Sequence, residues 1–162
     1  ILAPGDPNET EACMKNLFNS KGPSYLRLKK AGEPNYNNKV PILKPGVWNE
    51  IIKSKNKKIF LTTSGGLELA NKLLKQKEFK DYGIYSCCIW GAYLKSSQQE
   101  QIDSFDNIIT VEDHLLDCGF GSWLRESITD INSHLKISHK GLTKNVIGKV
   151  GSESFLYDLD NL

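Results

Sequence analysis

The residues best suited to chemistry are Glu112, Asp113 and His114, in the stretch TVEDHLLDCGFGSW at 110–123. Carboxylates and a histidine can act as general acid and base or bind a divalent metal. Three consecutive residues of an extended chain cannot all face one ion, because successive side chains point to opposite sides. Cys118 has no evident base beside it, and no serine lies in a G-x-S-x-G turn. The pattern therefore favours a hydrogen-bonded structural turn, and we expect neither a catalytic residue nor a metal ligand in this chain.

A second candidate is the glycine pair in TTSGGLE, at residues 62–68. Ser64, Gly65 and Gly66 lie where a predicted strand gives way to a helix, and the free N–H groups of a helix N-terminus can hold an anion. The stretch does not match the GxxxxGK[ST] phosphate loop, so a plain strand-to-helix turn is favoured over an anion site. The other histidines, His134 and His139, lie on or beside a predicted strand and are expected to be surface or packing residues.

Composition narrows the class of protein. The chain has 162 residues, 39% hydrophobic and 25% charged, with a net charge of +2, which is typical of a globular domain and too small to predict binding to nucleic acid. The lysine run KSKNKK at 53–58 has no interleaved aromatics and indicates a solvated loop. The chain shows no signal peptide, no apolar run of about 18 residues and no CxxC pair, so we expect a reduced, cytoplasmic protein that does not contact a membrane.

The first 38 residues form a separate unit by their pattern. Asp6 can cap a helix with Pro7 in its first turn, the stretch Lys21 to Pro23 ends that helix, and SYLRL at 24–28 alternates as a strand does. Residues 29–46 are rich in Pro, Gly and Asn, which is typical of a linker. We therefore place a domain boundary near residue 38, which divides the chain into 1–38 and 39–162. Because the sequence begins without methionine, we also expect a piece of something longer.

Beyond the linker, strands alternate with helices. Strands are predicted at 47–52, 58–64, 82–90, 105–112 and 134–139, and helices at 65–79, 97–103 and 120–131. The nearly continuous apolar run at 82–90 predicts a central strand. The first two strands have no helix between them, so one should be antiparallel to the rest. The expected fold is a three-layer α/β/α domain with an approximately five-stranded, mostly parallel sheet and one antiparallel strand. Ser152 is a capping-type residue in the last segment.

The order of several motifs resembles the C-terminal part of the transketolase family. The motifs are GPSYLRLKKAGEP, LKPGVWNEI, KIFLTTSGGLELANKLL, NIITVEDHLLDCGFGSWLRESI and KVGSESFLYDLDNL. The TVEDH…GFGS segment is the most specific, and the resemblance covers nearly the whole chain. By this resemblance, residues 1–38 are similar to the end of a pyrimidine-binding domain, and residues 39–162 to the transketolase C-terminal domain.

The resemblance implies a fragment or subunit of an enzyme that uses thiamin diphosphate and Mg²⁺. Members of the family transfer two-carbon ketol units or decarboxylate 2-oxo acids, and they hold the metal through a GDG…N motif that this sequence lacks. The chain should therefore have no complete cofactor site and no activity alone. Its partners would be the N-terminal domains or subunit of the same enzyme, in a homodimer whose assembly this region supports. Ketose phosphate, 2-oxo acid and deoxyxylulose chemistry all remain open.

The resemblance also assigns roles to individual residues. A family arginine that holds the sugar phosphate corresponds to Lys30, which keeps the charge but loses the two-pronged geometry of a guanidinium. The loop containing the acidic triplet becomes an interdomain or intersubunit contact, formed by Glu112, Asp113, His114, Gly119 and Gly121. Two alternatives stay open: a free-standing, non-catalytic binding or regulatory module that uses the SGG and VEDHLLDCGFG loops, and an independent enzyme with His114 as its general base.

Overall fold

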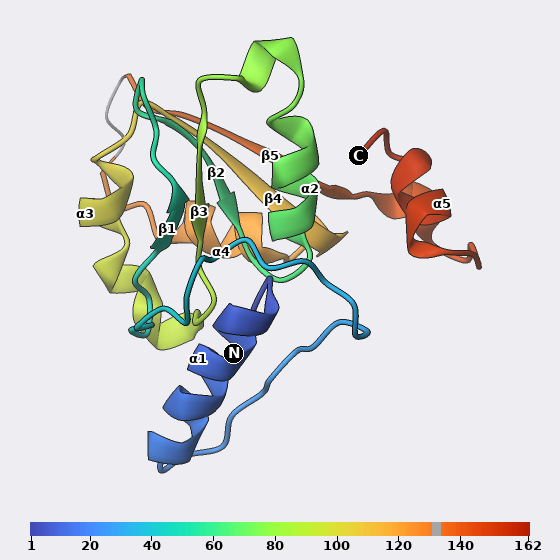
Figure 1. Cartoon of the computed structure of the whole chain (residues 1–162). Coiled ribbons are helices and arrows are strands. Elements are labelled where there is room, and N and C mark those ends of the chain that lie inside the picture. The colour runs from blue at the N-terminus through green and yellow to red at the C-terminus, as the bar shows by residue number, and fades with distance from the viewer. Residues whose placement is uncertain (131–133) are drawn as a thin grey trace.

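A five-stranded sheet organises the molecule, which a computed structural model describes over residues 1–130 and 134–162. Its strands are β1 (Asn49–Ile52), β2 (Lys58–Thr62), β3 (Gly83–Ser86), β4 (Asn107–Leu115) and β5 (Lys136–Leu142). They lie in the order β1-β3-β2-β4-β5 (Figure 1). β1 runs antiparallel to β3, and the other pairs are parallel. The predicted α/β sheet with one antiparallel strand is therefore confirmed. β2 occupies the middle, with the predicted central strand β3 beside it.

The helices are shorter than their apolar patterns predicted. They are α1 (Pro7–Asn19), α2 (Gly66–Leu73), α3 (Gln99–Ile102), α4 (Phe120–Glu126) and α5 (Glu153–Asp158). The helix expected over 65–79 stops at Leu73 because the following KQKEF offers few apolar side chains to bury, and a 3₁₀ turn follows at Lys77–Phe79. The last residue of the helix expected over 120–131 lies outside the described residues. Within the described ranges, no helix is both long and apolar enough to cross a membrane.

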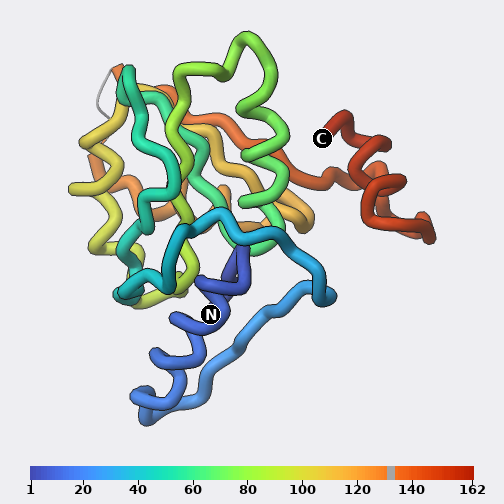
Figure 2. The backbone as a smooth tube through the Cα atoms, in the orientation of Figure 1, coloured from blue at the N-terminus to red at the C-terminus, as the bar shows by residue number. Residues whose placement is uncertain are grey.

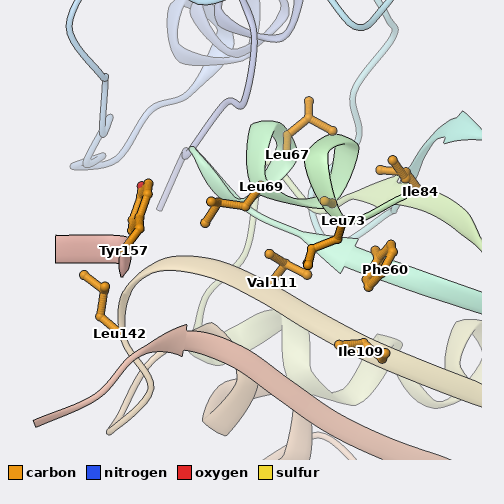
Figure 3. Close-up of a cluster of buried hydrophobic side chains, with 10 residues drawn as sticks. Phe60, Leu67, Leu69, Leu73, Ile84, Ile109, Val111, Leu142 and Tyr157 are labelled. Atoms are coloured by element: carbon orange, nitrogen blue, oxygen red, sulfur yellow. The ribbon is translucent and has the colours of Figure 1, made fainter. Parts of the chain in front are cut away.

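Alternation along the strands sends side chains into two cores, one on each face of the sheet. Phe60 of β2 and Ile109 of β4 lie on the side of α2 to which Leu73 points, in an apolar cluster that also includes Leu67 (Figure 3). On the other face, their sequence neighbours on β2 and β4 pack against α4 in a second cluster that includes Ile59, Leu61, Ile108, Phe120, Trp123 and Leu124. Fully buried strands of this kind are expected where helices cover both faces of a sheet.

The N-terminal segment is joined to the sheet by its own small core. Asp6 Oδ1 accepts the Glu9 N–H at 2.7 Å, which confirms the predicted helix start at Pro7. The predicted strand at 24–28 is reduced to a single bridge between Leu26 and Leu2. Figure 2 shows the chain returning beside α1 as an extended segment before it enters the sheet. Contacts with the sheet are made by an apolar cluster of Leu2, Ala12, Cys13, Leu43, Cys88 and Ile89.

Candidate functional site

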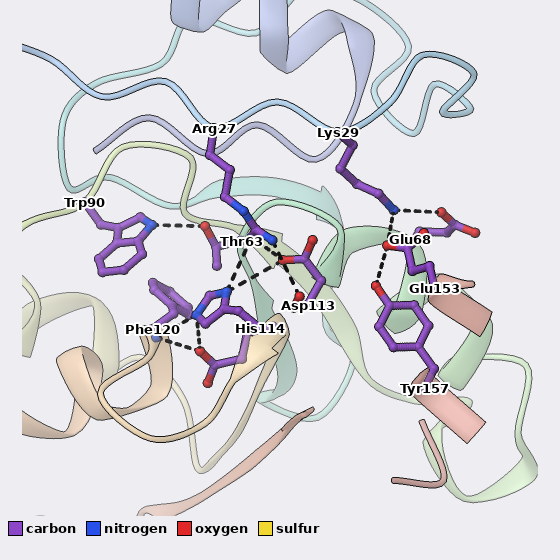
Figure 4. A network of polar contacts seen from close by, with 11 residues as sticks. Arg27, Lys29, Thr63, Glu68, Trp90, Asp113, His114, Phe120, Glu153 and Tyr157 are labelled. Atoms are coloured by element: carbon purple, nitrogen blue, oxygen red, sulfur yellow. Dashed lines mark hydrogen bonds and ion pairs between the residues drawn. The ribbon is translucent and has the colours of Figure 1, made fainter. Parts of the chain in front are cut away.

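The acidic triplet lies inside β4, which continues to Leu115, three residues beyond its predicted end. His114 stands between the two acids: its Nε2 is 2.6 Å from Glu112 Oε2, and its Nδ1 is 3.7 Å from Asp113 Oδ1 (Figure 4). The pairing of β4 with β5 is irregular between Val111 and Leu115, so strict alternation is broken there. The imidazole thus fills the space between the acids. No group of three or more His, Cys, Asp or Glu in the described chain is arranged to hold a metal.

Glu112 caps the start of α4. Its fully buried carboxylate accepts the Phe120 N–H at 2.6 Å and the Gly121 N–H at 3.0 Å. Such caps satisfy the free N–H groups of a helix N-terminus and suit its positive dipole end. The flanking glycines make room for this cap, because a Cβ at Gly121 would lie 2.9 Å from Glu112 Oε1 and 2.7 Å from Thr110 Oγ1. The GFG motif is therefore explained by close packing of a buried acid on the α4 backbone.

Asp113 forms an ion pair with Arg27, a residue that the sequence analysis did not single out. Arg27 Nη1 lies 2.5 Å from Asp113 Oδ1, although the two are 86 positions apart. Burial of Asp113 opposes its charge, but the hydrogen bond from His114 and the positive charge of Arg27 hold its pKa below the ordinary value. The one available signal was an arginine within the apolar stretch YLRL. The pair ties the N-terminal segment to the carboxyl end of β4.

His114 is positively charged at neutral pH. Burial lowers its pKa, but hydrogen bonds to Asp113 and Glu112 outweigh burial and raise the pKa to about 9. A histidine that keeps its proton at pH 7 cannot accept one from a substrate, which argues against the open alternative of His114 as a general base. Its charge instead balances the two acids.

A pocket of about 590 Å³ opens beside this network, between the segment after α1 and the helix α5. Lys29 crosses part of it, with its Nζ 3.5 Å from Glu68 Oε2 and 3.1 Å from Glu153 Oε1 (Figure 4). The Tyr157 hydroxyl donates to Glu153 Oε1 at 2.6 Å. Lys30 also lines the pocket, is exposed, and forms no ion pair with any described residue. The pocket therefore holds one free lysine beside two basic residues that are already neutralised.

The predicted anion site lies at the junction of β2 and α2, next to the same network. Ser64 adopts a positive φ of 50°, and its buried Oγ has no hydrogen-bond partner among the described residues. A Cβ at Gly65 would lie 2.6 Å from Asp113 Oδ2, so a carboxylate of the protein itself already approaches this helix N-terminus. Gly66 backs directly onto the Val111 carbonyl. Gly65 thus packs against the charged network, while the Gly66 and Leu67 N–H groups donate to the Thr63 and Ser64 carbonyls at 3.0 and 3.1 Å.

The other two histidines lie at or near β5. His139 Nδ1 lies 2.7 Å from Thr110 Oγ1 on the neighbouring strand, and His134 is exposed and precedes β5. Cys13, Cys87 and Cys88 are buried and Cys118 is exposed, and all four are free thiols.

Comparison with known proteins agrees with this architecture. No protein-family model matches the sequence. The 1-deoxy-D-xylulose-5-phosphate synthase of Clostridium tetani (strain Massachusetts / E88) is 28% identical over 166 residues, covering 99% of this chain and 26% of that protein. The synthase of Clostridium perfringens (strain SM101 / Type A) is 24% identical over 167 residues, covering 100% of this chain and 26% of that protein. The chain therefore spans about a quarter of the length of the curated relatives it matches.

Among solved structures, a chain described as a split gene transketolase, inactive beta4 tetramer, superimposes with a TM-score of 0.75 and 17% identity. The match covers 97% of this chain and 50% of that chain, and at this identity it is a likeness of fold. The resemblance drawn from the sequence motifs is thereby confirmed: this chain is homologous to the C-terminal region of the transketolase family's 1-deoxy-D-xylulose-5-phosphate synthases.

Proposed function

We propose that this chain is the C-terminal fragment or subunit of a transketolase-like enzyme that depends on thiamin diphosphate. The observation that carries the proposal is the coverage of the sequence matches, which run through 99% and 100% of this chain but only 26% of each relative. In this proposal residues 1–38 end a pyrimidine-binding domain, and residues 39–162 form the C-terminal domain. The chain supports assembly of the dimer and forms part of the surroundings of the active site. The N-terminal domains or subunit complete that site.

The cofactor does not fit the residues of this chain. Thiamin diphosphate binds with Mg²⁺, which needs oxygen ligands gathered around one point. The described residues offer no such cluster of acids, and three of the four acids that line the pocket, Asp113, Glu68 and Glu153, are engaged by Arg27 and Lys29. We therefore propose that the cofactor binds to the rest of the parent enzyme.

The role proposed for the β4–α4 segment is contact between domains or subunits. Glu112, Gly119 and Gly121 hold the segment in shape, while Asp113 joins it to Arg27. We propose that this region takes part in a homodimer. The free cysteines agree with the further proposal of a cytoplasmic protein.

Lys30 is the residue we propose to hold a substrate phosphate. Of the three basic residues lining the pocket, Arg27 and Lys29 are paired with acids, while Lys30 has no ion pair within the described chain. In a reconstituted enzyme, Lys30→Ala should raise KM for a phosphorylated substrate by about tenfold, since one charge-assisted contact is lost, and Lys30→Arg should restore it. An unchanged KM in Lys30→Ala would remove this role.

Cofactor titration tests the main proposal. Calorimetry of the full chain with thiamin diphosphate and Mg²⁺ should show no binding. Adding the polypeptide that matches the rest of the relatives should give a complex that binds the cofactor and forms 1-deoxy-D-xylulose 5-phosphate or transfers a ketol unit. Tight cofactor binding by this chain alone would contradict the proposal.

The alternative function is a free-standing binding module, favoured by one observation: residues of this chain line a pocket of about 590 Å³. The coding sequence next to Ile1 discriminates the two. A region with the GDG…N motif, upstream or in an adjacent gene, supports the enzyme subunit, whereas its absence from both places supports the module.

A further inference from the structure

Two basic residues that line the pocket differ in how firmly they are paired. Arg27 is bound to Asp113, whose side chain is only 3% exposed, so moving Arg27 away would leave a buried carboxylate poorly compensated. Lys29 is bound to Glu68 and Glu153, whose side chains are 30% and 51% exposed. Water can solvate either of these acids when the lysine leaves it. Lys29 is therefore the cation that can change partners, while Arg27 is fixed.

Both acids that contact Lys29 have a second partner of their own. Glu68 Oε1 lies 2.7 Å from the Nζ of Lys72, one turn further along α2. Glu153 Oε1 accepts a hydrogen bond at 2.6 Å from the hydroxyl of Tyr157, one turn further along α5 (Figure 4). When the ammonium group of Lys29 moves away, neither carboxylate is left without a partner. Releasing Lys29 from α5 therefore costs little.

The stem of Lys29 is held in place, whereas its charged end is loosely bound. A Cβ at Gly65 would lie 3.0 Å from Lys29 Cδ, so the aliphatic part of the lysine packs on the turn between β2 and α2. Its Nζ lies 3.5 Å from Glu68 and 3.1 Å from Glu153, both longer than usual for a hydrogen bond between charged groups. Lys30, the next residue, lines the same pocket. An anion in the pocket would thus meet one free lysine and one weakly held lysine.

We propose that Lys29 is a second phosphate-binding residue of the pocket, and that Glu153 of α5 holds it until a phosphate monoester displaces the carboxylate. Such an ester carries about two negative charges at neutral pH, against the single charge of a carboxylate. It can therefore bind Lys29 and Lys30 together, which offsets the loss of the contact with Glu153. This inference rests on the proposed phosphate role of Lys30 and names the side chain that competes with the substrate.

Titration of the full chain with glycerol 3-phosphate, followed by NMR at constant ionic strength, tests the exchange. Glu153→Gln keeps the shape of the side chain but removes the competing charge, so affinity should rise by about fivefold, as expected for the loss of a partly exposed ion pair. Lys29→Met should weaken binding by about threefold. In the Lys29→Met background, Glu153→Gln should change affinity by less than about twofold, because the lysine for which it competes is gone. A gain in affinity cannot result from a damaged fold.

Glu33→Gln is the matched control, since Glu33 also lines the pocket and forms no ion pair with any described residue. Its loss of charge should change affinity by the same factor with and without Lys29, as a general change in the electrostatic field does. If Glu153→Gln has no effect, or if its gain persists in Lys29→Met, Glu153 does not compete for Lys29 and the inference is overturned.

Lys30→Ala separates this inference from the proposed function. If Lys30→Ala weakens binding while Glu153→Gln gives no gain that depends on Lys29, the role of Lys30 stands and the exchange at Lys29 is wrong. If Lys30→Ala has no effect while the gain in Glu153→Gln does depend on Lys29, phosphate binds at Lys29 and the role of Lys30 fails. If neither the wild type nor Glu153→Gln binds glycerol 3-phosphate, both are wrong.

Discussion

Two buried carboxylates, Glu9 on α1 and Asp113 on β4, show how neighbours decide the charge state of an acid. Glu9 is fully buried and, among the described residues, meets only neutral donors: the Gly5 N–H at 2.8 Å, the Ser86 hydroxyl at 3.1 Å and the Asn49 amide at 3.1 Å. Burial raises its pKa, and these hydrogen bonds only partly offset the effect. Asp113 is almost as deeply buried, yet it is paired with Arg27 and His114, and its pKa is lowered.

The difference implies that stability depends on pH in opposite directions at the two contacts that join the N-terminal segment to the sheet, one through Glu9 and one through Arg27. A raised pKa in the folded state means that stability is lost as pH rises from the ordinary range of a glutamic acid through the pKa of Glu9. A lowered pKa means that stability is present above the ordinary value of an aspartic acid and is lost as pH falls through the pKa of Asp113. Both sites attach the first 38 residues to the sheet, so the attachment is weakened from both directions.

Removing the positive charge of Arg27 should have the largest effect on the free energy of unfolding. Arg27→Met leaves the Asp113 carboxylate buried with His114 as its remaining charged partner, and we expect a loss of about 3 kcal/mol in the free energy of unfolding at pH 7. The loss should shrink at a pH low enough to protonate Asp113. Urea unfolding at both pH values measures it.

The matched control for this change is Lys15→Met, because Lys15 and Glu11 form an ion pair with both side chains more than half exposed. That variant should change stability by less than about 0.5 kcal/mol. If both variants lose the same amount, burial of the Arg27 pair does not distinguish it from a surface pair.

Removing the helix cap should have the next largest effect. Glu112→Ala leaves the Phe120 and Gly121 N–H groups without their acceptor, and we expect a loss of about 2 kcal/mol. Asp117→Ala, at an exposed acid between β4 and α4, should cost less than about 0.5 kcal/mol. Thermal unfolding of both variants compares them, and equal melting temperatures would show that the cap contributes nothing.

The periodicity of the sequence was sufficient to predict the sheet but not the network. Ile59 and Phe60 alternate between opposite cores, as a period of two requires, and the lack of a helix between the first two strands predicted the antiparallel β1. Segment ends were less accurate because they depend on tertiary contacts. β4 continues to Leu115, whose partner Leu142 is 27 positions away, and no local pattern contains that pairing.

The site could be predicted only in its local part. The glycines after the triplet correctly indicated a tight entry into α4, since residues 112 to 121 lie on one short stretch of chain. The ion pair between Arg27 and Asp113 joins segments 86 positions apart. No local sequence pattern around either residue predicts that the two are partners. Family resemblance located the β4–α4 segment, but its internal hydrogen bonds required the structure.

Replacing Glu9, which has no basic partner among the described residues, should have a smaller effect on the free energy of unfolding, and this effect should depend on pH. Glu9→Gln keeps the shape of the side chain but turns an amide N–H₂ toward one of three donors, so we expect a loss of about 1.5 kcal/mol at pH 4, below the ordinary pKa of a glutamic acid. As pH rises, the wild type loses stability through the raised pKa of Glu9 and the variant does not, so the gap should narrow. Urea unfolding at pH 4, 6 and 8 measures the gap, and a constant gap would mean that Glu9 has an unshifted pKa.

The smallest effect on stability is expected at His114, whose positive charge balances the charges of Glu112 and Asp113. Its folded pKa of about 9 lies above the ordinary 6.5, so its contribution is complete below pH 6.5 and is lost as pH rises through 9. Wild-type stability should therefore decline between these values, while His114→Gln, less stable by under about 1 kcal/mol at pH 6, should decline less. His139→Gln is the control, because burial lowers the pKa of His139 and removes its charge from this range. If the His114 and His139 variants follow the same pH profile from 6.5 to 9.5, His114 does not carry the charge that balances Glu112 and Asp113.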